Sequence, residues 1–322
     1  MTSTTITLRA TCYRLVRCTA LLAVLTAAAA CSSDDTPTAP ACQDVVLHAD
    51  MRDGDTRATL ANTWTQGDLV AVDFGGTVKQ YHVVSETGTL KGIDAANTHH
   101  WDITNTDAVS IRAWAMGSSA KYLAAFPEAI TIDDDQSDAD KLQAQDFLMA
   151  PARNIAHADE PHTLTFYHQL AQVIFRIKLA DPESGMTAIS GATIGTTANP
   201  VRLNGTFTPP TGNATYGTWA FGSTTGVITP CETTPSYGFS KAYTAVVIPG
   251  TYAVGTPLLT LTATEGDYTY LVAGSALTLA TGGSYTFDVT VENHSIIVRL
   301  AGSIIGWGQV GRNIQVQPSN SF

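Results

Sequence analysis

The chain has 322 residues, a formal net charge of −11 and a hydrophobic content of 44%, while only 14% of its residues are charged. This length suits two domains, and the apolar share is ample for packed cores, which argues against a disordered chain. Because Lys and Arg are thinly spread in an acidic chain, the composition argues against nucleic acid as a partner and against adhesion to anionic lipid. Any attachment to a membrane must therefore come from a dedicated anchor.

The first thirty residues have the pattern of a secretory signal peptide. An almost wholly apolar stretch, residues 19–30, is preceded by arginines and followed at once by Cys31. Because this stretch is too short to span a bilayer comfortably, residues 1–30 predict a cleaved signal rather than a transmembrane anchor. A cysteine directly after small residues resembles a bacterial lipobox, although Ala28 stands where that pattern prefers Leu. We therefore predict lipidation of Cys31, with a plainly cleaved signal as the alternative.

Residues 31–42 are predicted to be a flexible, lipidated tether. Two serines and two aspartates follow Cys31, and then come Thr, Pro and Ala, which bury little. An acidic cluster directly behind a lipid-bearing cysteine resembles the surface-export signal of Bacteroidetes lipoproteins; the alternative is a solvated linker. Beyond the tether, Cys42 and Cys231 leave at most one possible disulfide, and no Cys/His spacing suggests zinc.

The body of the chain begins with the alternation of a β-strand. The apolar positions of residues 45–51 are Val45, Leu47, Ala49 and Met51. A period of two predicts a strand with one apolar face. This strand ends directly before Arg52.

Similar alternation recurs throughout the body. Residues 164–170 alternate, the phase slips, and residues 173–179 resume the pattern, which predicts a bulge or a bend. Residues 259–263 and 268–272 flank a Glu-Gly-Asp turn at residues 265–267, which predicts a hairpin. Many short strands at this spacing predict an all-β chain built of sandwiches.

Two features of the middle of the chain set the predicted domain limits. The only helix that we expect is short, around residues 138–149. A polar stretch with prolines at both ends, residues 151–161, divides the body, and a second candidate break lies at residues 181–185. The first choice gives an N-terminal domain of residues 43–157 and a C-terminal domain of residues 158–322.

Three segments together resemble the fimbrillin family of Bacteroidales pilus subunits, the FimA/Mfa-like group. They are T-R-A-T at 56–59 with Trp64 and G-D-L-V-A-V at 67–72; D-F-L-M-A at 146–150 with L-x-F-x-H-x-L-A-x-V-x-F-x-I at 164–177; and G-S-Y-T-F-x-V-T-V at 283–291 with I-I-G-W at 304–307. The resemblance implies two tandem transthyretin-like β-sandwich domains and export as an outer-membrane lipoprotein with palmitate on Cys31. It also implies cleavage by a protease and polymerisation with other pilus subunits by strand exchange, for surface adhesion.

The residues suggest a physical form of this maturation. We hypothesise that residues 43–57 contain a removable strand and that an arginine-directed protease cuts between Arg57 and Ala58, with Arg52 as the second choice. Loss of the strand would leave an apolar groove and an open sheet edge, which a strand from another subunit can fill. The alternative for Arg57 is an exposed loop arginine.

The C-terminal tail, residues 309–322, is the candidate donor of that strand. Val310, Ile314 and Val316 share one parity, and Pro318 ends the pattern. The alternative is that this tail forms the last strand of its own domain.

No motif supports catalysis, a metal or another cofactor. An S-x-x-K pattern at residues 118–121 lacks the companion motifs of the serine enzymes that use it. The acidic cluster at residues 133–135 lacks the Gly and Glu of an EF-hand and is predicted to be a solvated loop. His168 is predicted to be a hydrogen-bonded core residue. We thus expect a structural pilus subunit; the alternatives are a non-polymerising surface lipoprotein that binds glycan or host protein and, less favoured, a surface hydrolase.

Overall fold

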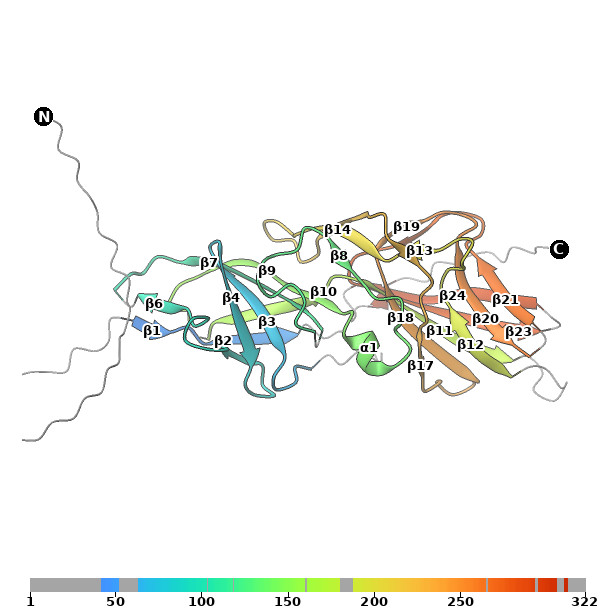
Figure 1. Cartoon of the computed structure of the whole chain (residues 1–322), viewed down its shortest axis with the longest axis horizontal. Helices are drawn as coiled ribbons and strands as arrows, with labels where there is room; N and C mark the ends of the chain where they lie inside the picture. The colour runs from blue at the N-terminus through green and yellow to red at the C-terminus, as the bar shows by residue number, and fades with distance from the viewer. Residues whose placement is uncertain are drawn as a thin grey trace, which may run out of the picture. The chain divides into compact units, whose positions relative to one another are not determined.

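The computed structural model describes most of residues 40–322, which form a single compact unit. The described residues are 42–51, 63–102, 104–117, 119–159, 161–179, 188–264, 266–292, 295–305 and 310–311. Nearly every element is a β-strand (Figure 1), which confirms the all-β prediction. In this part of the chain no helix has the length and apolar character needed to cross a bilayer.

Seven described strands of the first half close into a barrel in the order β10-β2-β5-β4-β3-β7-β9. Their bounds are β2 Leu47–Met51, β3 Leu69–Phe74, β4 Thr77–Val83, β5 Thr89–Gly92, β7 Val109–Met116, β9 Phe147–Ile155 and β10 Thr163–His168. The barrel closes because β10 pairs in parallel with β2 and antiparallel with β9. A short ribbon, β1 (Cys42–Asp44) with β6 (His100–Asp102), adjoins it.

The second half contains a six-stranded sheet in the order β17-β18-β11-β23-β24-β25. Its bounds are β17 Cys231–Thr233, β18 Lys241–Val247, β11 Ala171–Leu179, β23 Gly283–Glu292, β24 Ser295–Ile305 and β25 Val310–Gly311. A three-stranded sheet orders β12 (Ile189–Thr193), β20 (Pro257–Ala263) and β21 (Gly266–Leu271). The hairpin predicted around residues 265–267 is confirmed, since Ala263 of β20 pairs with Gly266 of β21.

Three small sheets complete the described strands. Their pairings are β15 (Thr218–Phe221) with β14 (Asn204–Thr208) and β14 with β8 (Ile130–Thr131); β13 (Val201–Arg202) with β16 (Thr225–Gly226); and β19 (Gly250–Tyr252) with β22 (Leu277–Leu279). The β8–β14 pair joins segments more than seventy residues apart in sequence, so the first half supplies a strand to a sheet of the second.

The buried hydrophobic side chains form two clusters, and β7 and β9 belong to both. Leu148 and Ala150 of β9 face the barrel interior, whereas Phe147 and Met149 pack into the larger cluster of the second half. β7 divides in the same way, because successive side chains of a strand point to opposite faces. These two strands are therefore apolar on both faces, as a shared wall between two cores requires.

One sequence prediction needs correction, and two others can be placed in the structure. The helix α1 covers only Ala139–Gln143, capped by the Asp138 side chain, and residues 147–149 begin β9 because their alternate side chains enter the two cores. Within the stretch expected to divide the domains, residues 151–155 also belong to β9. The phase slip after His168 is the bend that the alternation predicted, because at Leu170 the chain passes from β10 of the barrel to β11 of the six-stranded sheet.

Candidate subunit-assembly site

The strand β2 lies inside the barrel with a neighbour on each side. Residues 48–51 pair in parallel with residues 163–166 of β10, and residues 47–48 pair antiparallel with residues 89–90 of β5. Additional backbone bonds join the His48 amide to the His162 carbonyl at 2.9 Å and the Ala49 amide to the Gly88 carbonyl at 2.8 Å. Removing β2 would therefore open two strand edges at once.

The apolar side chains of this segment fill the barrel interior. Val45, Leu47 and Ala49 are 1%, 0% and 5% exposed, and Met51 packs partly buried against the same cluster. Gly88 permits the close approach of β2: its φ is +79°, and a side-chain carbon there would collide with the Ala49 carbonyl. The site is thus built to hold an extended segment tightly against the backbone on one side.

Tyr81 of β4 fixes the start of this segment from inside the barrel. Its hydroxyl donates a hydrogen bond to the Val45 carbonyl oxygen at 3.3 Å and accepts one from the His99 amide at 3.2 Å. Burial raises the pKa of Tyr81 to about 12, so the hydroxyl stays protonated at physiological pH. The His99 carbonyl in turn accepts from the Val45 amide at 2.8 Å.

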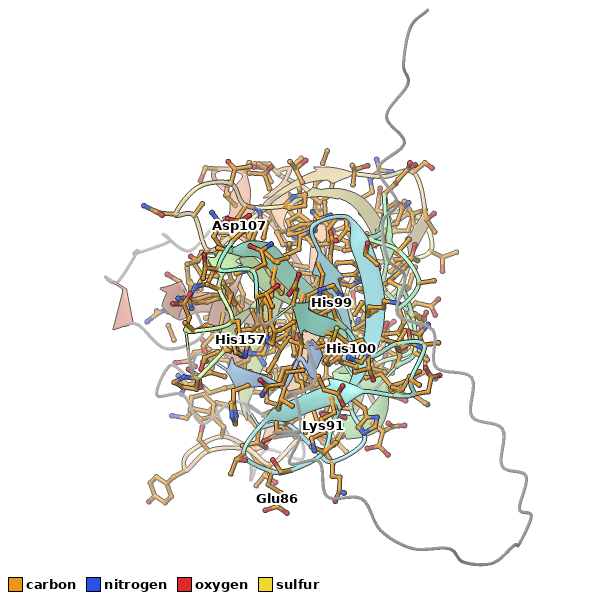
Figure 2. All side chains as sticks on the ribbon, turned by 90° about the vertical axis from the view of Figure 1, so that its left-hand side faces the viewer. Glu86, Lys91, His99, His100, Asp107 and His157 are labelled. Atoms are coloured by element: carbon orange, nitrogen blue, oxygen red, sulfur yellow. The ribbon has the colours of Figure 1, made fainter. Side chains whose placement is uncertain are left out.

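Two further histidines contact the β1 segment (Figure 2). His100 Nδ1 lies 2.9 Å from Asp44 Oδ1, and His157 Nε2 lies 2.9 Å from Gln43 Oε1. Figure 2 looks onto the face where His99, His100 and His157 lie. Because the contacts of His100 with Asp44 and of His157 with Gln43 lie at the surface, each contributes little by itself. We call His99, His100 and His157 the histidine clasp.

The remaining residues of the predicted maturation mostly lie outside the described part. This applies to Cys31, Arg52, Arg57, Ala58, Ile314 and Val316. Val310 lies in β25, where it pairs with Ile304 at the edge of the six-stranded sheet. In the structure, the start of the tail is thus an edge strand of its own chain.

The residues that were weighed as candidates for catalysis, metal binding or a disulfide have structural roles in the fold. His168 is buried and its Nδ1 lies 2.9 Å from Asp146 Oδ1, which confirms it as a hydrogen-bonded core residue. Among residues 133–141, hydrogen bonds from Lys141 and Ser137 lower the pKa of Asp135 to about 2. Cys231 has a buried thiol whose Sγ donates to the Glu232 carbonyl oxygen at 3.5 Å.

The described residues contain no group of three His, Cys, Asp or Glu side chains arranged to hold a metal ion.

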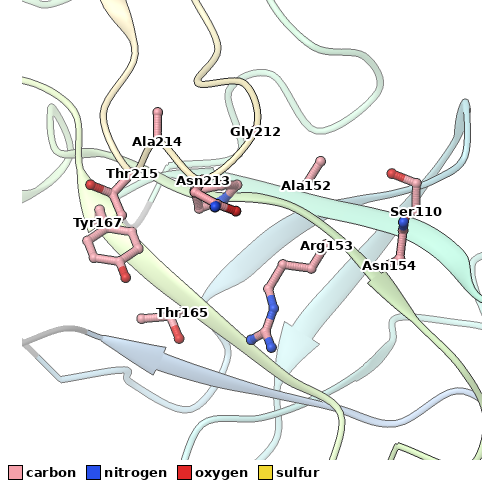
Figure 3. A pocket seen from close by; sticks show the side chains of 11 residues that line it. Ser110, Ala152, Arg153, Asn154, Thr165, Tyr167, Gly212, Asn213, Ala214 and Thr215 are labelled. Carbon is pink, nitrogen blue, oxygen red and sulfur yellow. The ribbon is translucent and has the colours of Figure 1, made fainter.

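Sequence reasoning missed a groove of about 710 Å³ beside the barrel seam (Figure 3). Its lining is mostly polar and comes from β7, β9, β10 and the loop of residues 212–215. The lining residues are Ser110, Pro151, Ala152, Arg153, Asn154, Thr165, Tyr167, Gly212, Asn213, Ala214 and Thr215. The sequence signal was the polar pair Arg153 and Asn154 after a largely apolar run, which is not distinctive without the fold.

Comparison with known proteins gives a family and a fold. The sequence profile of the family described as Fimbrillin-like matches residues 56–307. No curated protein shows a significant match.

Several solved structures resemble the chain. A candidate cell adhesion protein from Bacteroides uniformis ATCC 8492 is 18% identical with a TM-score of 0.57, and the match covers 82% of this chain and 98% of that chain. Another from Bacteroides ovatus ATCC 8483 is 18% identical with a TM-score of 0.58, covering 84% and 100%. A fimbrial protein from Bacteroides vulgatus ATCC 8482 is 13% identical with a TM-score of 0.47, covering 82% and 100%. At such identities the first two likenesses establish a shared fold.

Proposed function

The chain belongs to the fimbrillin-like family, and from this premise we propose that it is an exported pilus subunit that polymerises by strand exchange. The family is structural, and the chain is not an enzyme but a fimbrial, cell-adhesion type of protein. The resemblance to this family is confirmed over most of the chain. The observation that carries the proposal is that β2 is a barrel strand whose last residue, Met51, directly precedes Arg52.

In this proposal the newly exported chain is held at the outer membrane by a lipid on Cys31, with residues 32–42 as its tether. The body consists of two tandem transthyretin-like domains with a boundary near residue 157, and β10 then reaches back across that boundary to close the barrel of the first domain. Metabolic labelling with palmitate tests the anchor: the wild-type chain is expected to carry label, and the Cys31→Ala variant none. Label on that variant would contradict the assignment.

Cleavage between Arg57 and Ala58, or after Arg52, cuts the covalent link between β2 and the rest of the barrel. The segment then stays only through its hydrogen bonds and through the burial of Val45, Leu47, Ala49 and Met51. Burial of four such side chains is worth on the order of 5–10 kcal/mol gross, before the association costs. A segment held in this way occupies the β2 position of the barrel in the precursor, and another strand can displace it after the cut.

The replacement strand is proposed to be the tail of another subunit, with Val310, Ile314 and Val316 in the positions of the β2 side chains. In the described part of the tail, β25 pairs with β24 at residues 310–311, and this pairing has to be released before the tail can enter another subunit. Once inserted, the tail gains the ladder to β5 and β10 together with apolar burial.

The test is treatment of purified precursor with an arginine-specific protease. The wild-type chain is expected to give a ladder of SDS-resistant oligomers whose N-terminus is Ala58. Arg57→Gln should stop that cut, and comparison with Arg52→Gln separates the two candidate sites. A clipped chain that stays monomeric would contradict polymerisation and favour a surface lipoprotein that binds glycan or host protein.

A further inference from the structure

The groove at the barrel seam (Figure 3) is open because β9 and β10 separate there. β10 pairs with β9 only at Tyr167 and His168, whereas residues 163–166 pair with β2 on the other side. On β9, Pro151 and Ala152 together oppose the single Arg112 of β7, which is a β-bulge. The bulge breaks the alternation of β9 and leaves residues 152–154 exposed toward the groove.

The groove wall opposite β9 is the loop of residues 212–215, which hydrogen bonds and a ring contact hold in place. The side-chain amide of buried Gln169 donates hydrogen bonds to the carbonyl oxygens of Thr215 and Tyr167, each at 3.2 Å, and accepts one from the Gly217 amide at 3.0 Å. The Tyr216 ring packs edge-on against Tyr167 at a centroid distance of 5.8 Å. Both walls are therefore held in place before any ligand arrives, which lowers the cost of binding.

The groove offers hydroxyl groups, side-chain amides, one tyrosine ring and one guanidinium group. Asn154, Asn213 and Thr165 can each exchange hydrogen bonds with hydroxyl groups of a ligand. No described carboxylate forms an ion pair with Arg153, whose Nη1 donates to the Thr163 carbonyl at 3.2 Å. Charges more than about 8 Å away are largely screened at physiological salt, so the net charge of −11 does not by itself keep an anion out of this groove.

We propose that this groove binds the carboxylate-bearing end of an acidic saccharide, with Arg153 on the carboxylate and the surrounding amides and hydroxyls on the sugar ring. The planar guanidinium suits a carboxylate. A volume of about 710 Å³ lies within the range of small-ligand sites. An added β-strand fits less well, because the bond from Arg153 to the Thr163 carbonyl already bridges the two strand edges.

One neighbouring charge opposes this ligand. Asp50 of β2 is exposed and pairs in register with Thr165 of the groove wall, so its carboxylate shares that face of the sheet. Neutralising it should strengthen binding in the intact chain by a modest factor of about two to three, as for an exposed charge pair. If β2 leaves during maturation, as proposed above, Asp50 leaves with it and the groove becomes more favourable for an anion.

The experiment is calorimetric titration of the uncleaved chain with 3′-sialyllactose, with lactose as the neutral match. Sialyllactose is expected to bind at least about tenfold more tightly, and Arg153→Gln is expected to abolish that preference, since hydrogen bonds to charged groups are worth this much. Arg202→Gln, at an exposed arginine of β13 outside the groove, is the control and should bind as the wild type does. Asp50→Asn should bind more tightly.

A glucuronic-acid disaccharide and its neutral glucose counterpart, titrated in parallel, separate the two sources of carboxylate. Preference for either acidic sugar supports the site and identifies its source. Equal binding of lactose and sialyllactose, no binding of either acid at millimolar concentration, or an unchanged affinity of Arg153→Gln would overturn it. Binding in the groove of the peptide 309–322 in place of saccharide would overturn it as well. Since the uncleaved chain is used, the outcome does not depend on polymerisation.

Discussion

Two central strands, β2 and β11, have the same kind of neighbours but differ in how many of their residues are paired with those neighbours. Each lies between one parallel and one antiparallel partner: β2 between β10 and β5, β11 between β23 and β18. The ladder of β11 runs over residues 172–179 on one side and 171–177 on the other. That of β2 covers only residues 48–51 and 47–48.

Burial does not distinguish the two strands, because Leu47 of β2 and Phe175 of β11 are both fully buried. What differs is the length of the ladder and the position in the chain. β11 is in mid-chain and is part of the six-stranded sheet, whereas β2 is the second described strand and lies next to candidate cleavage sites. A strand that is held mainly by side-chain burial, beside a candidate cleavage site, is the kind that can be exchanged for another of similar pattern.

The largest effect is expected for Phe175→Ala. Phe175 is buried and stacks on Phe287 at 5.3 Å, so its truncation leaves a cavity and should cost about 3–5 kcal/mol. Urea unfolding should show this loss in the precursor and, equally, in the cleaved chain. A loss in only one of the two forms would mean that β11 is not the permanent strand we take it to be.

Leu47→Ala should cost about 2–5 kcal/mol in the precursor, again through a cavity in the barrel. The same substitution should have no effect on the stability of an assembled, cleaved chain, because the residue is no longer there. Urea unfolding of both forms measures the difference. If cleaved oligomers also lose stability, they still contain β2, and the comparison with β11 fails.

Tyr81→Phe should destabilise the precursor by about 1–2 kcal/mol, through loss of the hydrogen bonds to the Val45 carbonyl and from the His99 amide. It should also speed release of the cut segment, which mass spectrometry of the freed peptide follows. Tyr237→Phe, at a fully exposed tyrosine, is the matched control. Equal release rates in the two variants would show that Tyr81 does not hold the segment.

The smallest effect is a pH dependence carried by His99. Burial, with Lys79 and His100 nearby, lowers the pKa of His99 below its ordinary value of 6.5. The unfolded chain therefore takes up this proton first as pH falls, so stability is fully present above pH 6.5 and declines below it. Unfolding at about pH 7.5 and about pH 5.5 should show less decline for His99→Phe, which can keep the stacking on Phe74. An identical decline in both proteins would show that His99 does not carry this pH dependence.

Sequence periodicity predicted the strands well where one face is buried. The alternation of residues 45–51 corresponds to β2, and that of residues 173–179 lies within β11. The turn at residues 265–267 was recognisable because its chemistry is local. His168 was correctly placed in the core because it shares the apolar parity of β10.

Periodicity could not predict features that depend on distant segments. The barrel closes through β2 and β10, which are more than a hundred residues apart, and no local pattern encodes that pairing. Residues 147–149 were expected in a helix because both of their faces are apolar, and two cores explain this only once the fold is known. The groove depends on the bulge at Pro151 and on the anchoring amide of Gln169, whose partners lie in a loop more than forty residues away.

Native mass spectrometry of the protease-treated precursor tests the exchange of β2 most directly. We predict oligomers built of chains that begin at Ala58, from which the peptide containing residues 42–51 has departed. Clipped monomers that retain this peptide, or oligomers in which every chain still holds it, would contradict the account.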